Sequence, residues 1–335
     1  MKHTSEDHRP DDLNPYHQAV LLEIILGLAG LALLTVGADH LVLGSSRIAA
    51  RMRLSPVVVG VVVIGLGTSA PEFLVSGVAA ASGTPGIAVG TIVGSNILNL
   101  TFVLGVAALI APVAVTSTVV RREVPVAVAA VALFAAASLI GLSLGVGLAL
   151  LVPLALALFL LIRWAKEGPD PELSDEVEQF TAPDAPLQAH RMGFEVPRAI
   201  AGLAGVLIGA NLIVGNASSL AGRFGVSDLV IGFTIVAIGT SLPELVTTIQ
   251  AQRRGETDLV VGNLFGSNLF NSLAGGAVIG VASGSSVAEP EHALLAAMLL
   301  VALLAWALLR RGLRLTRVEG LILILAYAAS LPLLI

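Results

Sequence analysis

The chain has 335 residues and a net charge of −5, with 56% hydrophobic but only 12% charged residues. Water-soluble domains carry about a quarter charged residues, so this composition excludes an ordinary soluble enzyme and indicates an integral membrane protein. The sequence has no cysteine, which excludes disulfides, thiolate metal sites and a cysteine nucleophile.

The chain begins with a polar segment, residues 1–18, whose mixed charges predict a solvated tail. A transmembrane helix needs about 20 apolar residues, and the apolar runs after the tail predict ten such helices in an all-α membrane protein. Their ranges are 19–43, 56–81, 87–112, 123–141, 145–163, 198–218, 228–250, 258–283, 291–309 and 317–334.

Only one connection between these helices is long. Residues 164–197 contain eight acidic residues, two basic residues and five prolines. This composition is typical of a solvated linker that cannot bury a core. We therefore expect two five-helix units, 19–163 and 198–335, joined by this linker.

The basic residues predict the orientation, because Lys and Arg accumulate in cytoplasmic loops. With the loops numbered alternately, fifteen basic residues fall on one side, and only Lys2, Arg9 and Arg223 fall on the other. This bias places the N-terminal tail outside and the 164–197 linker in the cytoplasm. The basic residues form no stripe, so no nucleic-acid partner is expected, and no protein partner is evident.

The two units carry related sequences. A shift of 172 residues aligns GLGTSAPE at 65–72 with AIGTSLPE at 237–244, and VGTIVGSNILN at 89–99 with VGNLFGSNLFN at 261–271. Because five is an odd number, the second unit must insert with the opposite topology to the first. Inverted repeats are typical of secondary transporters, whose sites lie near the bilayer midplane between the repeats.

Each repeat places one glutamate, Glu72 or Glu244, in the middle of an apolar helix. A charged side chain there costs about 2.5–3.5 kcal/mol on insertion scales, and no basic residue lies in these apolar segments to pair with it. Pro71 and Pro243 each remove a helical hydrogen bond, which predicts a kink and free main-chain oxygens beside the glutamate. Free carbonyls at membrane depth are tolerated where they line a cavity.

Neutral oxygen ligands surround these glutamates in the sequence pattern. Helical spacing puts two hydroxyls on each glutamate's own face and a Ser and an Asn on one face of the following helix. Oxygen ligands suit Ca²⁺, which takes about six to eight, and also Na⁺, whereas copper and zinc prefer softer ligands. For the asparagines, hydrogen bonding between helices is a rival role. The candidates are Thr68, Ser69, Ser95 and Asn99, with Thr240, Ser241, Ser267 and Asn271.

GTS-x-PE and GSN-x-x-N each occur twice at matched spacing, and in these motifs the chain resembles the cation/Ca²⁺ exchanger superfamily, closest to its prokaryotic Na⁺/Ca²⁺ exchangers. The resemblance covers both five-helix halves. It implies an antiporter in a prokaryotic cell membrane, in which Na⁺ and Ca²⁺ compete for a midplane site by alternating access. It implies neither an enzyme nor a cofactor.

The family's ligand positions map onto the eight neutral side chains above together with Glu72 and Glu244, and its backbone-carbonyl positions map onto Gly65 and Ala237. Some relatives, including those that also move K⁺, have Asp where this chain has Asn271. K⁺ cotransport is therefore not expected.

Other functions are weaker. A Ca²⁺/H⁺ antiporter is the main alternative, although that family typically has GN-x-x-E in place of GTS-x-PE. A passive cation channel would use the same oxygen cage, but two tandem halves with kinked helices suit alternating access better. An intramembrane hydrolase would need a catalytic dyad or an HExxH motif, and the sequence has neither.

Overall fold

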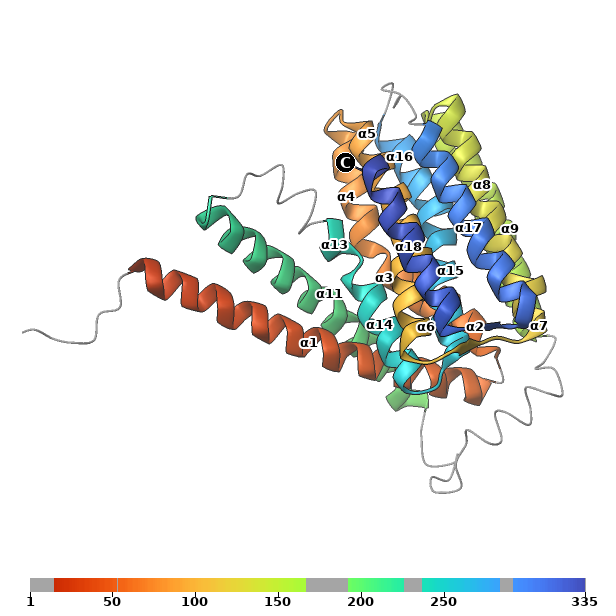
Figure 1. Ribbon diagram of the computed structural model, residues 1–335, viewed down its shortest axis with the longest axis horizontal. Coiled ribbons are helices and arrows are strands. Elements are labelled where there is room, and N and C mark those ends of the chain that lie inside the picture. The colour runs from red at the N-terminus through yellow and green to blue at the C-terminus, as the bar shows by residue number, and fades with distance from the viewer. Residues whose placement is uncertain (1–14, 53, 167–191, 226–236, 284–291, 335) are drawn as a thin grey trace, which may run out of the picture.

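The computed structural model describes residues 15–52, 54–166, 192–225, 237–283 and 292–334. Within these ranges, seven helices are long and apolar enough to cross a membrane, or eight if the bent pair Val57–Thr68 and Ala70–Ala81 forms one span. The protein is therefore an all-α integral membrane protein, as its composition predicted (Figure 1).

The first half contains five helical segments at the predicted places. The first is α1 (Pro15–Met52) and the second combines α2 (Pro56–Val59), a π-helical turn η1 (Gly60–Gly65), α3 (Leu66–Thr68) and α4 (Ala70–Ala81). The third combines α5 (Pro85–Leu98), the π-helical turn η2 (Asn99–Val103) and α6 (Leu104–Ile110). The fourth and fifth are α7 (Ser117–Arg121) with α8 (Glu123–Ile140), and α9 (Leu144–Lys166).

The second half follows the same plan. It begins with α11 (Met192–Arg223), followed by α13 (Ala237–Thr240) and α14 (Leu242–Arg253). The eighth segment combines α15 (Thr257–Phe270), the π-helical turn η5 (Asn271–Gly275) and α16 (Gly276–Ala282). The last two are α17 (His292–Gly312) and α18 (Arg317–Leu334). Residues 228–236 of the predicted seventh helix lie outside the described residues.

A short antiparallel strand pair joins two connections at one end of the bundle. Strand β1 (Val113–Ala114) follows α6, and strand β2 (Arg314–Leu315) lies between α17 and α18. Val113 pairs with Leu315 and Ala114 with Arg314. The strands therefore tie the first repeat to the second.

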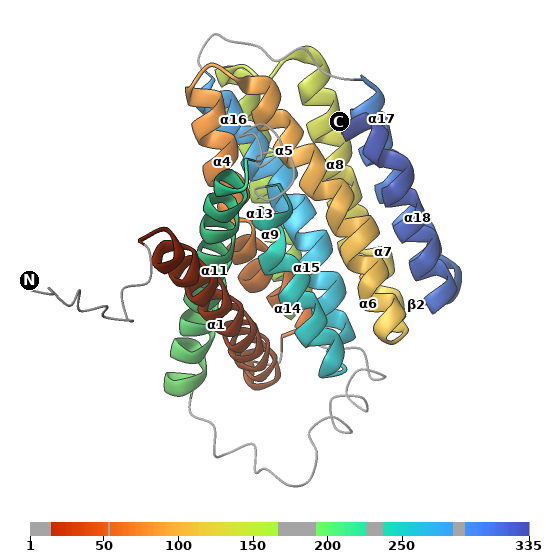
Figure 2. The same cartoon turned by 60° about the vertical axis from the view of Figure 1, so that its left-hand side comes forward.

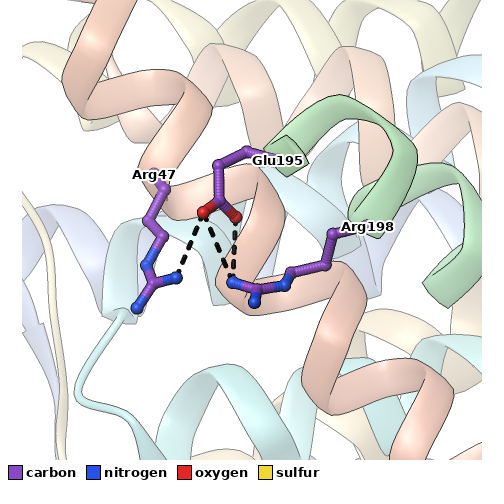
Figure 3. Close-up of polar contacts among 3 residues, drawn as sticks. All are labelled: Arg47, Glu195 and Arg198. Atoms are coloured by element: carbon purple, nitrogen blue, oxygen red, sulfur yellow. Dashed lines mark hydrogen bonds and ion pairs between the residues drawn. The ribbon is translucent and has the colours of Figure 1, made fainter. Parts of the chain in front are cut away.

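Two helices are longer than their hydropathy predicted. Helix α1 runs from Pro15 to Met52 rather than over 19–43, and α11 begins at Met192 rather than at 198. The added turns pair their charges: Arg47 lies 3.1 Å and Arg198 3.0 Å from the carboxylate of Glu195 (Figure 3). Both described ends of the predicted 164–197 linker are therefore helical, since α9 continues to Lys166 and α11 begins at Met192.

Helices α1 and α11 lie side by side and antiparallel (Figure 2). A Cβ atom added to Gly30 would lie 2.9 Å from Gly209 O, and one added to Gly37 would lie 2.8 Å from Gly202 O. As the residue number along α1 rises, the residue number of its contact on α11 falls, so the two helices run in opposite directions. The 172-residue shift exchanges these two contacts, which confirms the predicted inversion for the first helix of each repeat.

The third and eighth segments form the buried centre of the molecule. Within Pro85–Ile110, 72% of an 18-residue apolar stretch is buried, and within Thr257–Ala282 the share is 83%. Glycines allow α15 to lie directly against the second segment. A Cβ atom added to Gly262 would lie 2.5 Å from Val57 O, and one added to Gly266 would lie 2.6 Å from Val61 Cα. The close approach of these two segments thus requires glycine at both positions. At Gly90, by contrast, an added Cβ would meet no described atom within 4 Å.

Candidate cation site

A serine interrupts each of the two helices that carry the central glutamates. Ser69 separates α3 from α4 with a bend of 44°, and Ser241 separates α13 from α14. Pro71 lies in the first turn of α4. Backbone N–H groups there have no partner within the helix, so the N–H that proline lacks costs no helical hydrogen bond. The glutamates also fall in these first turns, where the N–H groups and the dipole of a helix favour a negative charge.

Glu72 is fully buried and is held by serines from both repeats. Its Oε1 accepts a hydrogen bond from Ser95 Oγ at 3.4 Å and another from Ser241 Oγ at 3.2 Å. Ser95 belongs to the GSN motif of the same repeat, whereas Ser241 belongs to the GTS motif of the other. The carboxylate therefore lies where the two halves of the protein meet.

Glu244 has the corresponding surroundings. Its Oε1 accepts hydrogen bonds from Ser267 Oγ at 3.4 Å and from Ser69 Oγ at 3.5 Å, and its side chain is fully buried. The 172-residue shift converts the contacts of Glu72 into those of Glu244. The two carboxylates consequently form one site with an internal twofold relationship.

Several buried oxygens at this site have no hydrogen-bond partner among the described residues. Burial of such atoms without a partner is costly, and a bound cation removes that cost by coordination. The described residues contain no group of three or more His, Cys, Asp or Glu side chains placed to hold a metal ion, so a cation here would need the two carboxylates and neutral oxygens. The unpaired atoms are Glu72 Oε2, Glu244 Oε2, Asn99 Oδ1 and Asn271 Oδ1.

Thr68, Ser267 and the Gly65 carbonyl lie together on the second and eighth segments. Thr68 Oγ1 is 3.0 Å from Ile64 O and 3.4 Å from Ser267 Oγ. The Gly65 carbonyl accepts hydrogen bonds from Ser267 Oγ at 3.3 Å and from the Ser69 N–H at 3.3 Å. This carbonyl is close to the site, but it is engaged in hydrogen bonds rather than freed by the kink.

The remaining candidates lie on the same elements. Thr240 is 8% exposed at the end of α13, and Ala237 is the first residue of that helix. Asn99 and Asn271 are fully buried, and each begins a π-helical turn. Such turns are rare in proteins, but those that occur are often found at functional sites. The structure thus buries the side chains of Thr240, Asn99 and Asn271 in the protein interior.

Sequence reasoning missed the role of the asparagines within the GSN motifs. Asn99 Nδ2 donates to Asn268 Oδ1 at 3.2 Å, and Asn268 Nδ2 donates to Asn96 O at 2.9 Å. Asn96 Nδ2 donates to Ser272 Oγ at 3.0 Å. These bonds link the third and eighth segments at the centre. The sequence feature that could have indicated them is the asparagine that follows the serine in each GSN motif.

Known proteins share this sequence and organisation. Residues 22–164 and 197–335 match the sodium/calcium exchanger protein family. The chain is 30% identical to the sodium/calcium exchanger MaX1 of Methanosarcina acetivorans, over 94% of this chain and 99% of that protein. It is 34% identical to the inner membrane protein YrbG of Escherichia coli, over 75% of this chain and 77% of that protein.

A solved structure of the sodium-calcium exchanger NCX_Mj has the same fold. It superposes with a TM-score of 0.80 at 34% sequence identity, over 94% of this chain and 100% of that chain. The family match spans both repeats, and the fold and the paired glutamates agree with it. The chain therefore belongs to the sodium/calcium exchanger family of membrane cation antiporters.

Proposed function

We propose that this protein exchanges Na⁺ for Ca²⁺ across the membrane by alternating access at the site of Glu72 and Glu244. The observation that carries this proposal is the pair of fully buried carboxylates, each held by serines from both repeats. Two carboxylates balance one divalent cation. Without a cation or protons, two like charges buried together would repel each other in a region of low dielectric.

The neutral oxygens around the carboxylates support competition between the two ions. Hydroxyl, amide and carbonyl oxygens replace the hydration shell of a monovalent ion without adding charge. Several Na⁺ ions therefore occupy subsites that overlap the single Ca²⁺ position, and antiport requires this mutual exclusion. We assign the ligand set to Thr68, Ser69, Glu72, Ser95, Asn99, Thr240, Ser241, Glu244, Ser267 and Asn271, with the carbonyls of Gly65 and Ala237.

The proposed orientation puts the linker in the cytoplasm and the N-terminal tail outside. Basic residues assigned to the cytoplasmic side form ion pairs here: Arg47 and Arg198 share Glu195, and Arg254 pairs with Asp39 of α1 at 2.5 Å. The relative from Escherichia coli is named an inner membrane protein. We propose the same kind of membrane for this chain, with residues 1–18 extracytoplasmic and residues 164–197 cytoplasmic.

Proteoliposomes provide the test. Vesicles loaded with Na⁺ should take up external Ca²⁺, whereas vesicles with only a pH gradient should not. Uptake driven by the pH gradient alone would favour a Ca²⁺/H⁺ antiporter, because the unpaired carboxylate oxygens also suit protons. Rates that exceed carrier turnover and persist without a counter-ion would indicate a cation channel.

A further inference from the structure

A buried asparagine links two helices of the ion site, the second segment that carries Thr68 and the helix α14 that carries Glu244. Asn263 lies on α15 one helical turn before Ser267 and two turns before Asn271, so the three side chains share one face. The side chain is 1% exposed. Its Oδ1 lies 3.4 Å from Thr68 Oγ1 on the second segment.

The other end of this amide is fixed by two threonines of α14. Asn263 Nδ2 donates to Thr247 Oγ1 at 3.1 Å and to Thr248 Oγ1 at 3.0 Å. Thr247 uses its own proton on Pro243 O at 2.6 Å, so it acts as the acceptor toward Asn263. This contact fixes the amide with its nitrogen toward α14 and its oxygen toward Thr68.

The orientation of Asn263 decides what Thr68 offers to an ion. The Thr68 hydroxyl lies 3.0 Å from Ile64 O, 3.4 Å from Asn263 Oδ1 and 3.5 Å from Gly65 O, which are all acceptors, and 3.4 Å from Ser267 Oγ. A hydroxyl that donates to the protein keeps its lone pairs for another partner. Asn263 Oδ1 adds an acceptor from another helix to the main-chain acceptors of the Thr68 proton. It thus favours a Thr68 hydroxyl that donates to the protein and keeps its lone pairs for a cation.

The first repeat lacks this arrangement. The 172-residue shift places Thr91 at the position of Asn263, and Thr91 Oγ1 donates to Ile87 O of its own helix at 2.9 Å. The same shift places Val75 and Ser76 at the positions of Thr247 and Thr248. Ser76 Oγ is buried and has no hydrogen-bond partner among the described residues. The link across helices thus occurs in one half of an otherwise twofold site.

We propose that Asn263 is a positioning residue that pre-organises Thr68 and thereby raises the affinity of the site for Na⁺. This inference rests on the proposed Na⁺/Ca²⁺ exchange. Asn263 and Thr68 are neutral, so the link leaves the charge of the site unchanged. Ca²⁺ binding depends mainly on the two carboxylates, whereas Na⁺ depends more on well-placed neutral oxygens. Pre-organisation lowers the cost of ordering the ligand when the ion binds.

The test measures ion binding and transport separately on the full chain. Purified protein is titrated with Na⁺ or Ca²⁺, and the rise in unfolding temperature gives an apparent dissociation constant for each ion. Asn263→Thr, which copies the other repeat, should weaken Na⁺ binding about 3- to 10-fold, the range of one neutral hydrogen bond. Its Ca²⁺ constant should change less than about twofold. The matched control Thr91→Val should change neither constant.

A double-mutant cycle shows whether Asn263 acts through Thr68. In a Thr68→Val background, Asn263→Thr should cause no further loss of Na⁺ affinity. Equal losses for Na⁺ and Ca²⁺, or the same Na⁺ loss with and without Thr68, would overturn the inference in favour of a structural role. If Asn263→Thr does not fold, Thr248→Val releases one end of the amide and should weaken Na⁺ binding in the same direction; an unchanged Na⁺ constant would contradict the proposal.

Wild-type transport in Na⁺-loaded liposomes separates this inference from the proposed function. A protein that binds Na⁺ but does not exchange it for Ca²⁺ would refute the exchange while the binding cycle still decides the role of Asn263. A wild-type protein that is not stabilised by Na⁺ at all would refute the positioning role.

Discussion

Ser241 of the second repeat donates a hydrogen bond to Glu72 of the first at 3.2 Å. Each carboxylate therefore depends on a residue of the opposite half, and the loss of either carboxylate should affect the whole site. Glu72→Gln and Glu244→Gln should each abolish Ca²⁺ exchange, because one remaining charge cannot balance a divalent ion in a region of low dielectric. Ca²⁺ flux into proteoliposomes is the measurement.

A second glutamate substitution controls for folding. Glu319 accepts a hydrogen bond from the Thr316 N–H at 2.8 Å at the start of α18, and glutamine serves equally in such a helix cap. Glu319→Gln should therefore preserve transport. Ca²⁺ flux at the wild-type rate in either site variant would refute the assignment of Glu72 and Glu244.

The repeated motifs made much of this site predictable, since each motif reports local geometry. The GTS-x-PE motif predicted a break beside the glutamate, and the structure has one at Ser69. The contact of Ser241 with Glu72 was not predictable, because it depends on how two inverted repeats dock. That docking follows from backbone contacts, such as Gly262 against Val57, which no spacing within one repeat reveals.

Helix ends were the least predictable part of the fold. A hydropathy pattern ends α1 where polar residues begin, but the helix continues through Arg47, which pairs with Glu195, to Met52. This partner lies far away in the sequence. Glu195 therefore reads as part of an acidic linker until the structure shows its two arginines.

The Glu195 ion pair should stabilise the contact between α1 and α11. The side chain of Glu195 is only 2% exposed, whereas that of Arg47 is 31% exposed and retains part of its hydration. Glu195→Gln should lower the free energy of unfolding by about 1–3 kcal/mol, less than for a fully buried pair. Thermal unfolding in detergent measures the change. Arg310→Gln, at an exposed position of α17, should stay within about 0.5 kcal/mol of wild type, and an equal effect of both variants would contradict this role.

The linker should connect the repeats without taking part in transport. Helix α9 ends at Lys166 and α11 begins at Met192, and the acidic, proline-rich sequence between them is typical of a solvated connector. Because the entropy of loop closure depends weakly on length, deletion of about six residues from 170–180 should preserve exchange. Loss of transport from a variant that still folds would instead show a gating or regulatory role.

The last prediction concerns the driving ion. Proton coupling needs only the carboxylates, whereas this site also places Thr68 Oγ1 3.4 Å from Ser267 Oγ, beside the hydrogen-bonded Glu244. Such neutral oxygens are useful to Na⁺ and unnecessary for a proton. If more charge moves with Na⁺ than with Ca²⁺, each excess charge contributes about 2.3 kcal/mol per 100 mV, so the flux should respond to membrane potential.

Thr68→Val and Thr240→Val test this choice, because each removes a neutral ligand without altering the charge of the site. Both should raise the Na⁺ concentration for half-maximal exchange about 3- to 10-fold, the range for one lost neutral contact, and change Ca²⁺ affinity less. The measurement is Ca²⁺ flux as a function of internal Na⁺ at fixed potential. Ca²⁺ uptake that follows a pH gradient in the absence of Na⁺, and that a Na⁺ gradient does not alter, would instead establish proton coupling, since Na⁺ would then not compete for the site.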